Sequence, residues 1–334
     1  MYDLIGDIHG HADELVRLLG ALGYRRTRTS YRHPDRKAIF VGDFIDRGPK
    51  IREVLDIVRP MVEAGSALAI MGNHELNALG FHTEHPRQPG TYLRLRSDKN
   101  IRQHRATMEQ LSGAELADAL AWFRTLPLWL DLDELRVVHA CWDEKAIGIV
   151  AAALRQDGAI PSLQGQHGGI NPAFLCAAHE RGSELFQAVD TILKGKEAKL
   201  PGGCSFADKD DHVRTEIRTQ WYRSPAGQTY GSYALQSDPI VCDVPLEAYP
   251  SSETPRRTRP TANPRSSVIT GCQPINRRYL PRTSPASITA SPRAAISAPT
   301  AGKANKSCAM SISCGRDAST GQPTDTMSPK GGGS

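Results

Sequence analysis

The sequence predicts an α/β fold in which a mainly parallel sheet is covered by helices. Between residues 2 and 75, short apolar segments alternate three times with loops, and amphipathic segments follow the first two loops. Each apolar segment runs into a loop that contains Gly together with Asp, His or Asn. In such folds the carboxyl ends of neighbouring parallel strands meet at one edge of the sheet, where ligands bind. We therefore expect these three loops to lie together.

The elements of this first part follow from the spacing of the apolar residues. Residues Leu15, Leu18, Leu19 and Leu22 recur at helical spacing, whereas the apolar runs before each loop are too short for helices. We predict strands over 2–6, 38–41 and 67–71, helices over 14–22 and 51–64, and loops over 42–50 and 72–75.

The middle of the chain is expected to add a second group of elements. The pattern predicts one helix over 101–124 and two strands over 128–131 and 135–139, joined by a turn at residues 132–134. The sequence pattern of residues 143–200 is mostly typical of helices. We predict that 143–240 forms a cap or substrate-binding region within a domain that spans 1–248.

The composition changes near Tyr249. From there to Ser334, Phe and Trp are absent, Tyr279 is the only further aromatic residue, and Pro, Ser, Thr, Arg and Ala dominate without a period. Such a segment buries too little apolar surface to offset the loss of backbone entropy on folding. We predict that 249–334 is a disordered tail.

Charge and cysteine content exclude several classes of protein. Much of the excess charge of +5 lies in the tail, so it says little about the substrate. Seven cysteines without a CxxC pair argue against a zinc ribbon and against a disulfide scaffold. No apolar run is long enough to span a membrane, and no signal sequence is evident at the start. We expect a cytoplasmic protein with no membrane partner and no nucleic-acid partner.

Three motifs carry the chemistry. They are GDIHG at 6–10, GDFIDRG at 42–48 and GNHE at 72–75, and each follows an apolar strand. Glycine lets the backbone turn tightly beside a metal or a phosphate, and Asp, His and Asn are ligands of manganese, iron, zinc or similar ions. One such motif is more often a capped turn than a metal site. Three of them at consecutive strand ends predict a metal site.

These motifs resemble the signature of the calcineurin-like metallophosphoesterases, in the form found in phosphoprotein phosphatases and their bacterial relatives. The segment VVHA at 137–140 is similar to the next ligand segment of that family. The resemblance implies a four-layer α/β/β/α sandwich, two sheets between helices, with two divalent metal ions. Manganese is expected, with iron, zinc, nickel or cobalt as alternatives.

The resemblance also implies the role of each residue. Asp7 and His9 would hold the first metal, Asp43 would bridge both, and Asn73 and His139 would hold the second. His74, supported by Asp46, would be the proton donor. Arg47 offers a fork of donors for phosphate, helped by Asn73 and, as a weaker candidate, Arg218. Glu75 is expected to give supporting hydrogen bonds, while His11, His82 and His85 are expected to be solvated loop residues.

One ligand of the family pattern is missing from this sequence. The pattern requires a further histidine after the His139 segment, usually as Gly-His at a strand end. The histidines that follow are His167, His179 and His212, and none of them has this context. However, codons exist for residues 267–272 that, when read in a frame displaced by one base, encode Gly-His-Tyr-Trp-Leu. We therefore interpret the tail as out-of-frame translation that begins between Val244 and Asn263. The alternative is a natural disordered tail that binds nucleic acid or an acidic surface, although its arginines form no dense cluster.

The predicted function is metal-dependent hydrolysis of phosphate monoesters. Asp46-Arg47 and Glu75 favour a serine/threonine protein phosphatase, whose partner would be a phosphorylated protein. One alternative is a hydrolase of dinucleoside polyphosphates, with a small nucleotide as substrate. Another is an impaired pseudoenzyme that binds phosphate, because the last ligand is absent. The copy with this tail is expected to have reduced activity.

Overall fold

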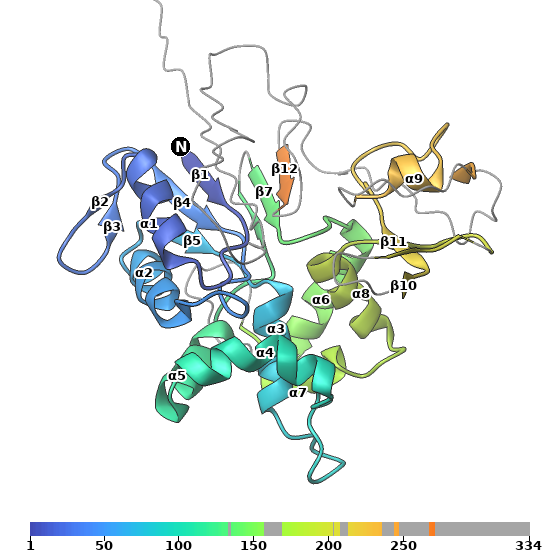
Figure 1. The fold of residues 1–334 in the computed structure, drawn as a ribbon, viewed down its shortest axis with the longest axis horizontal. Coiled ribbons are helices and arrows are strands. Elements are labelled where there is room, and N and C mark those ends of the chain that lie inside the picture. The colour runs from blue at the N-terminus through green and yellow to red at the C-terminus, as the bar shows by residue number, and fades with distance from the viewer. Residues whose placement is uncertain are drawn as a thin grey trace, which may run out of the picture.

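The computed structural model describes residues 1–132, 135–156, 169–202, 204–207, 213–235, 244–246 and 267–270. Figure 1 shows two small sheets near the middle of the molecule, with helices around them. The tail predicted to be disordered, 249–334, lies outside the described residues except for Ser267–Thr270. That segment forms a short strand, which differs from the prediction. Its Val, Ile and Thr residues are good strand formers.

The first sheet is parallel and has the strand order β1-β4-β5, with β1 over Tyr2–Ile5, β4 over Lys37–Phe40 and β5 over Ala67–Ala69. Helices α1 (Ala12–Ala21) and α2 (Ile51–Glu63) belong to the same apolar cluster as one face of this sheet. The side chains alternate between faces, because Ile5 and Phe40 belong to that cluster whereas Leu4 and Ile39 do not.

The second sheet has the order β12-β7-β6, where β6 is Trp129–Asp131, β7 is Leu135–Val138 and β12 is Ser267–Thr270. Strand β6 is antiparallel to β7, and β12 is parallel to β7. The two sheets pack face to face through a separate apolar cluster of Leu4, Ile39, Val41, Ile70, Leu130, Leu135 and Val137. The predicted pair of facing sheets is therefore present.

Two predicted elements differ from the structure in more than their end residues. Residues 101–124 form two helices, α4 (Asp98–Gln110) and α5 (Gly113–Phe123), because Ser112 caps the second helix and exchanges hydrogen bonds with Glu115. The predicted loop at 72–75 is instead the start of helix α3 (Asn73–His82), so Asn73, His74 and Glu75 lie in its first turn.

The region predicted as a cap contains helices α6 (Glu144–Gln156), α7 (Pro172–Ala178) and α8 (Glu184–Lys194). It continues with strands β8 (Glu197–Lys199), β9 (Phe206–Ala207), β10 (Val213–Arg214) and β11 (Glu216–Arg218) and helix α9 (Tyr230–Tyr233). A small hairpin, β2 (Arg25–Arg26) with β3 (Tyr31–Arg32), lies near the first sheet. No helix among the described residues is long and apolar enough to cross a membrane.

Candidate metal centre and active site

Loops from both sheets bring the predicted metal ligands to one place. Asp7 and His9 follow β1, Asp43 follows β4, Asn73 opens α3 after β5, and His139 follows β7. Strands β1, β4 and β5 are parallel neighbours, so their carboxyl ends share one edge. His139 reaches the same place from the facing sheet, because its Nδ1 atom donates to the carbonyl oxygen of Val41 at the end of β4.

The ligand atoms are close enough to share metal ions. Nε2 of His9 lies 3.6 Å from Oδ2 of Asp43 and 3.9 Å from Oδ2 of Asp7. Nε2 of His139 lies 3.7 Å from the same Oδ2 of Asp43 and 3.2 Å from Oδ1 of Asn73. Two atoms that each lie about 2.1 Å from one ion are at most about 4.2 Å apart. Asp43 therefore stands between two groups of potential ligands.

Buried polar atoms without partners point to the same interpretation. Oδ1 of Asp7 and Nε2 of His9 are buried and accept or donate no hydrogen bond among the described residues. In His9 and His139 the Nδ1 atoms donate to the carbonyl oxygens of Ile45 and Val41, at 2.9 and 2.6 Å. Each Nε2 atom can then present its lone pair to the cluster, which is the form of histidine that binds metals. These residues fit a centre of two divalent ions.

The electrostatics of the cluster suit a cation. Burial opposes ionisation of Asp43, but the nearby histidines His74, His139 and His9 outweigh this and lower its pKa to about 2. Burial lowers the pKa of His9 to about 4. Burial and the charge of Asp43 raise the pKa of Asp7 to about 6. At pH 7 these two aspartates are ionised and His9 is neutral, so all three are ready to bind a metal.

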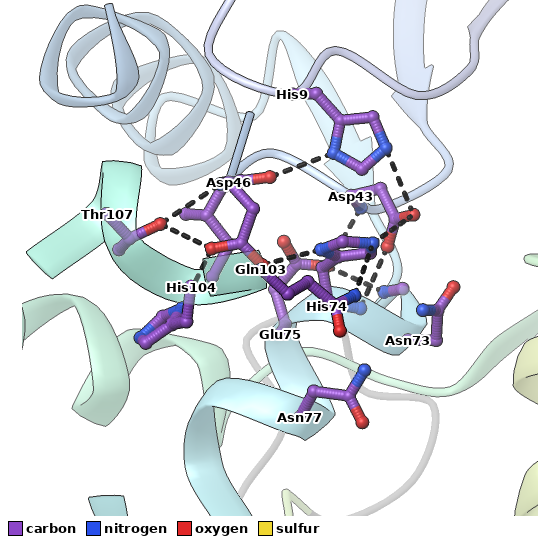
Figure 2. Close-up of polar contacts among 12 residues, drawn as sticks. His9, Asp43, Asp46, Asn73, His74, Glu75, Asn77, Gln103, His104 and Thr107 are labelled. Carbon is purple, nitrogen blue, oxygen red and sulfur yellow. Dashed lines mark hydrogen bonds and ion pairs between the residues drawn. The ribbon is translucent and has the colours of Figure 1, made fainter. Parts of the chain in front are cut away.

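His74 belongs to a second network beside this cluster (Figure 2). Its Nδ1 atom lies 2.6 Å from Oδ2 of Asp46. The other oxygen of Asp46 accepts from Nδ1 of His104 at 2.8 Å and from the hydroxyl of Thr107 at 2.6 Å. Nε2 of His104 in turn lies 3.0 Å from Nε2 of His82. Asp46 thus orients His74 and is itself held by α4.

The other ring nitrogen of His74 faces the predicted metal ligands. Its Nε2 atom lies 3.9 Å from Oδ2 of Asp43. Burial alone would lower the pKa of His74, but the charges of Asp43 and Asp46 and the hydrogen bond to Asp46 outweigh it, so its pKa is raised. A protonated imidazole in this position can give its proton to a departing oxygen.

Backbone strain is concentrated at the site. Four non-glycine residues among those described have positive φ angles: His9 at 45°, Asp43 at 55°, Asp46 at 68° and Arg47 at 67°. Each such residue costs about 1–3 kcal/mol, and the cost persists only where the surroundings hold the conformation. All four lie in the first two motif loops, which is where strain is expected when side chains must converge on a ligand.

Glu75 and the motif glycines hold two of these loops together. Oε2 of Glu75 accepts from the backbone amides of Asp43 and Gly72 at 2.8 and 2.9 Å, and Oε1 accepts from that of Phe44 at 2.8 Å. A Cβ atom on Gly42, whose φ is +89°, would lie 2.2 Å from the nitrogen of Gly72. The loops can therefore approach this closely only with glycine at 42.

A cleft of about 1350 Å³ opens from the predicted metal ligands. Arg47, which is exposed, and the predicted ligand Asn73 lie on its wall, together with Arg218, which is 3.9 Å from Glu197. Residues of α8, β8, β10 and β11 form part of the wall, so the region predicted as a cap contributes to the cleft. The basic residues that line it are Arg47, Arg94, Lys99, Arg102, Arg105, Arg181, Lys194, Arg214 and Arg218.

Two residues of the second network, His104 and Thr107, were not predicted from the sequence, because neither belongs to a motif. The signal available was two polar residues three apart on one helix, which places them on the same helical face. The prediction for His82 was wrong, since this residue ends α3, is half-buried and contacts His104 rather than lying in a solvated loop.

The family model for calcineurin-like phosphoesterases matches residues 2–142. This match spans both sheets up to β7 and includes all of the converging ligands. Over these residues the chain is similar to the calcineurin-like phosphoesterase family. The predicted fold class, a calcineurin-like mixed α/β fold, is confirmed.

Two relatives named bis(5'-nucleosyl)-tetraphosphatase PrpE [asymmetrical] are similar to the first part of this chain. The protein of Halalkalibacterium halodurans is 49% identical over 74 residues, and that of Bacillus velezensis is 43% identical over 74 residues. In both cases the match covers 22% of this chain and 30% of the relative, so less than a third of each relative is matched. A solved serine/threonine phosphatase structure from Saccharomyces cerevisiae is 16% identical, with a TM-score of 0.34, over 56% of this chain and 47% of that one.

Proposed function

We propose that this chain is built to hydrolyse phosphate esters or anhydrides with two divalent metal ions. The observation that carries the proposal is the convergence of Asp7, His9, Asp43, Asn73 and His139 on one point, with unpartnered ligand atoms beside the His74–Asp46 pair. When bound, two divalent ions lower the pKa of water and offset charge on the phosphate. Asp7 and His9 would hold one ion, Asn73 and His139 the other, and Asp43 both.

The remaining residues would bind and protonate the substrate. Arg47 stands at the cleft beside the ligands and offers a planar set of donors to a phosphate. His74 would give the proton on Nε2 to the departing oxygen, because its Nδ1 atom is engaged by Asp46. Arg218 would contact a more distant part of the substrate, since it lies in the cap region and already faces Glu197. Manganese suits the mixed oxygen and nitrogen ligands.

Two substrate classes remain candidates. Asp46-Arg47 and Glu75 favour phosphoserine or phosphothreonine in a protein, as the motif resemblance implies. The names of the PrpE relatives and the many basic residues in the cleft favour a dinucleoside polyphosphate, which carries several negative charges. We give the second class preference. Hydrolysis of diadenosine tetraphosphate and of a phosphoserine peptide, measured side by side, would separate the two classes.

The segment 249–334 affects the activity that we expect of this chain. Strand β12 pairs in parallel with β7, whose carboxyl end carries His139. This strand, Ser267–Thr270, falls within the segment where a one-base shift spells Gly-His-Tyr-Trp-Leu. Its place next to β7 supports the hypothesis that the missing histidine ligand belongs to this strand in the original frame. A chain without that ligand should bind the second metal more weakly.

The test compares two chains, one as written and one with the shifted frame restored. We expect manganese-dependent hydrolysis of para-nitrophenyl phosphate by the restored chain, and much slower hydrolysis by the chain as written. Asp43→Asn should remove at least about 99% of the activity, because it removes the shared ligand. Asp118→Asn, on the exposed surface, serves as the matched control. If both chains bind two metals and hydrolyse nothing, the phosphate-binding pseudoenzyme is the better description.

A further inference from the structure

Arg94 is a half-buried cation in the wall of the cleft. It lies between α3 and α4 and contacts both. Its Nη1 atom donates to Oδ1 of Asn77 at 2.6 Å, and its Nη2 atom donates to Oδ1 of Asn100 at 2.9 Å and to Oε1 of Gln103 at 3.0 Å. All three partners are neutral amides, so they orient the guanidinium without cancelling its charge.

No carboxylate neutralises Arg94 among the residues that the structure describes. Asp46 and Asp190 are near enough to interact with it electrostatically, but neither forms an ion pair with it. Asp46 is occupied by His74 and His104, and Asp190 pairs with Lys194. A partly buried charge without a counter-ion is costly, so an anion that bound beside Arg94 would offset this cost.

Two of the guanidinium's N–H groups remain available. A guanidinium has about five N–H donors, and three hydrogen bonds to amides are formed here. Arg181, in the connection between α7 and α8, lines the same cleft and interacts electrostatically with Arg94. Arg181 itself forms no hydrogen bond or ion pair within the described part of the chain. Two cations that repel each other across a cleft are stabilised when an anion binds between them.

The position of Arg94 relative to His74 indicates which part of the substrate it would contact. The amide of Gln103 accepts from Arg94 through Oε1, and its Nε2 atom lies 3.4 Å from Nε2 of His74. Figure 2 shows Gln103 and Asn77 beside His74, on α4 and α3 respectively. One amide group thus separates Arg94 from the nitrogen that would protonate the departing oxygen. Arg94 is therefore on the leaving-group side of the reaction centre.

We propose that Arg94 and Arg181 form a second anion subsite that binds a phosphate on the leaving-group side of the substrate. The inference rests on the proposed function, since that function defines the leaving-group side. The occupant is a phosphoryl group joined to the reacting one, as in a nucleoside polyphosphate, because a guanidinium's fork of donors matches phosphate oxygens. A single phosphate ester would leave the subsite empty.

The test measures binding rather than turnover. The probes are methylphosphonate, with one phosphoryl group, and methylenediphosphonate, with two that cannot be hydrolysed apart. Both are titrated calorimetrically into the full chain at one fixed concentration of free Mn²⁺. We expect Arg94→Gln and Arg181→Gln each to weaken binding of methylenediphosphonate about 10-fold or more and to change binding of methylphosphonate less than about 3-fold. Arg17→Gln, which changes an exposed arginine of α1 paired with Glu14, should change neither.

Other outcomes would overturn the proposal. Equal weakening of both probes would mean that Arg94 only holds α3 against α4 or acts through general charge. Weaker binding by Arg181→Gln could not be explained by misfolding, because this substitution removes no contact within the described residues. Unchanged affinities would exclude the subsite. Loss of binding only for a phosphoserine peptide with a neighbouring aspartate would assign the subsite to a carboxylate instead. Hydrolysis of para-nitrophenyl phosphate is measured in parallel. If the chain hydrolyses nothing but its binding of methylenediphosphonate depends on the two arginines, the proposed hydrolase function fails and the subsite stands.

Discussion

Asp46 is the residue on which the arrangement of the proposed proton donor depends. Burial opposes its ionisation, but hydrogen bonds from His104 and His74 outweigh burial and hold the pKa of Asp46 well below its usual range. Thr107 adds a third side-chain hydrogen bond and also accepts from the backbone amide of Asp46 at 3.0 Å. The carboxylate therefore stays charged and fixed, which keeps the Nδ1 proton of His74 in place.

We predict that His104→Leu slows the hydrolysis of phosphates with poor leaving groups. Without His104, Asp46 loses one of its partners and His74 loses its fixed orientation. An alkyl phosphate should then react at least about 10-fold more slowly, whereas para-nitrophenyl phosphate, which needs little protonation, should change less than about 3-fold. His104→Asn, whose amide can replace the Nδ1 donor, should restore most of the rate. Equal losses with both substrates would contradict the positioning role.

At the scale of elements, Glu75 joins the first turn of α3 to the loop after β4. Burial and the charge of Asp43 raise the pKa of Glu75 to about 7, while three backbone amides donate to its carboxyl oxygens. We predict that Glu75→Ala lowers the free energy of unfolding by at least about 3 kcal/mol, because each of three buried donors loses its acceptor at about 1–3 kcal/mol. Urea denaturation of the metal-free protein measures this. Glu53→Ala, on the exposed side of α2, is the control.

The contact between α3 and α4 should depend on pH through His82. Burial, followed by the charges of His104 and Arg96, lowers the pKa of His82 to about 4. The unfolded chain takes up this proton near pH 6.5, so it binds more protons than the folded protein between pH 6.5 and 4. The contribution of neutral His82 to the free energy of unfolding is therefore fully present above pH 6.5, and it is lost as the pH falls towards 4. Thermal unfolding at several pH values should show that His82→Gln loses less stability on acidification than the unmodified chain. An identical loss of stability would exclude His82 as the group responsible.

For the whole molecule, the apolar cluster between the sheets is what sets His139 opposite Asp7 and Asp43. Ile39 is fully buried in this cluster, on the face of the first sheet away from α1 and α2. We predict that Ile39→Ala lowers the free energy of unfolding by about 2–5 kcal/mol, as expected for a truncated core residue. Leu95→Ala, at a residue that is 61% exposed, should change the free energy of unfolding by less than about 0.5 kcal/mol. A small change in the free energy of unfolding for Ile39→Ala would mean that packing between the two sheets contributes little to stability.

Much of the fold and the convergence of most of the candidate metal ligands could be predicted because the information is local. Each motif loop follows its own apolar strand, so Asp7, Asp43 and Asn73 were located from residues a few positions away. The break between α4 and α5 was also local, in the capping residues Ser112 and Glu115, but the prediction gave more weight to the continuous helical pattern. The start of α3 was missed because Gly72 and Asn73 are typical of turns as well as of helix starts.

By itself, the sequence determined the strand–loop–helix order and the ligand types at the strand ends, since both depend on neighbours in the chain. Only the tertiary structure decided which distant residues support them. His104 contacts Asp46 across 58 positions in the sequence, and the amide of Gln103 on α4 links Arg94 to His74 on α3. No local pattern specifies such pairs. They arise because the buried carboxylate and the uncompensated guanidinium each need partners that only the packed helices can supply.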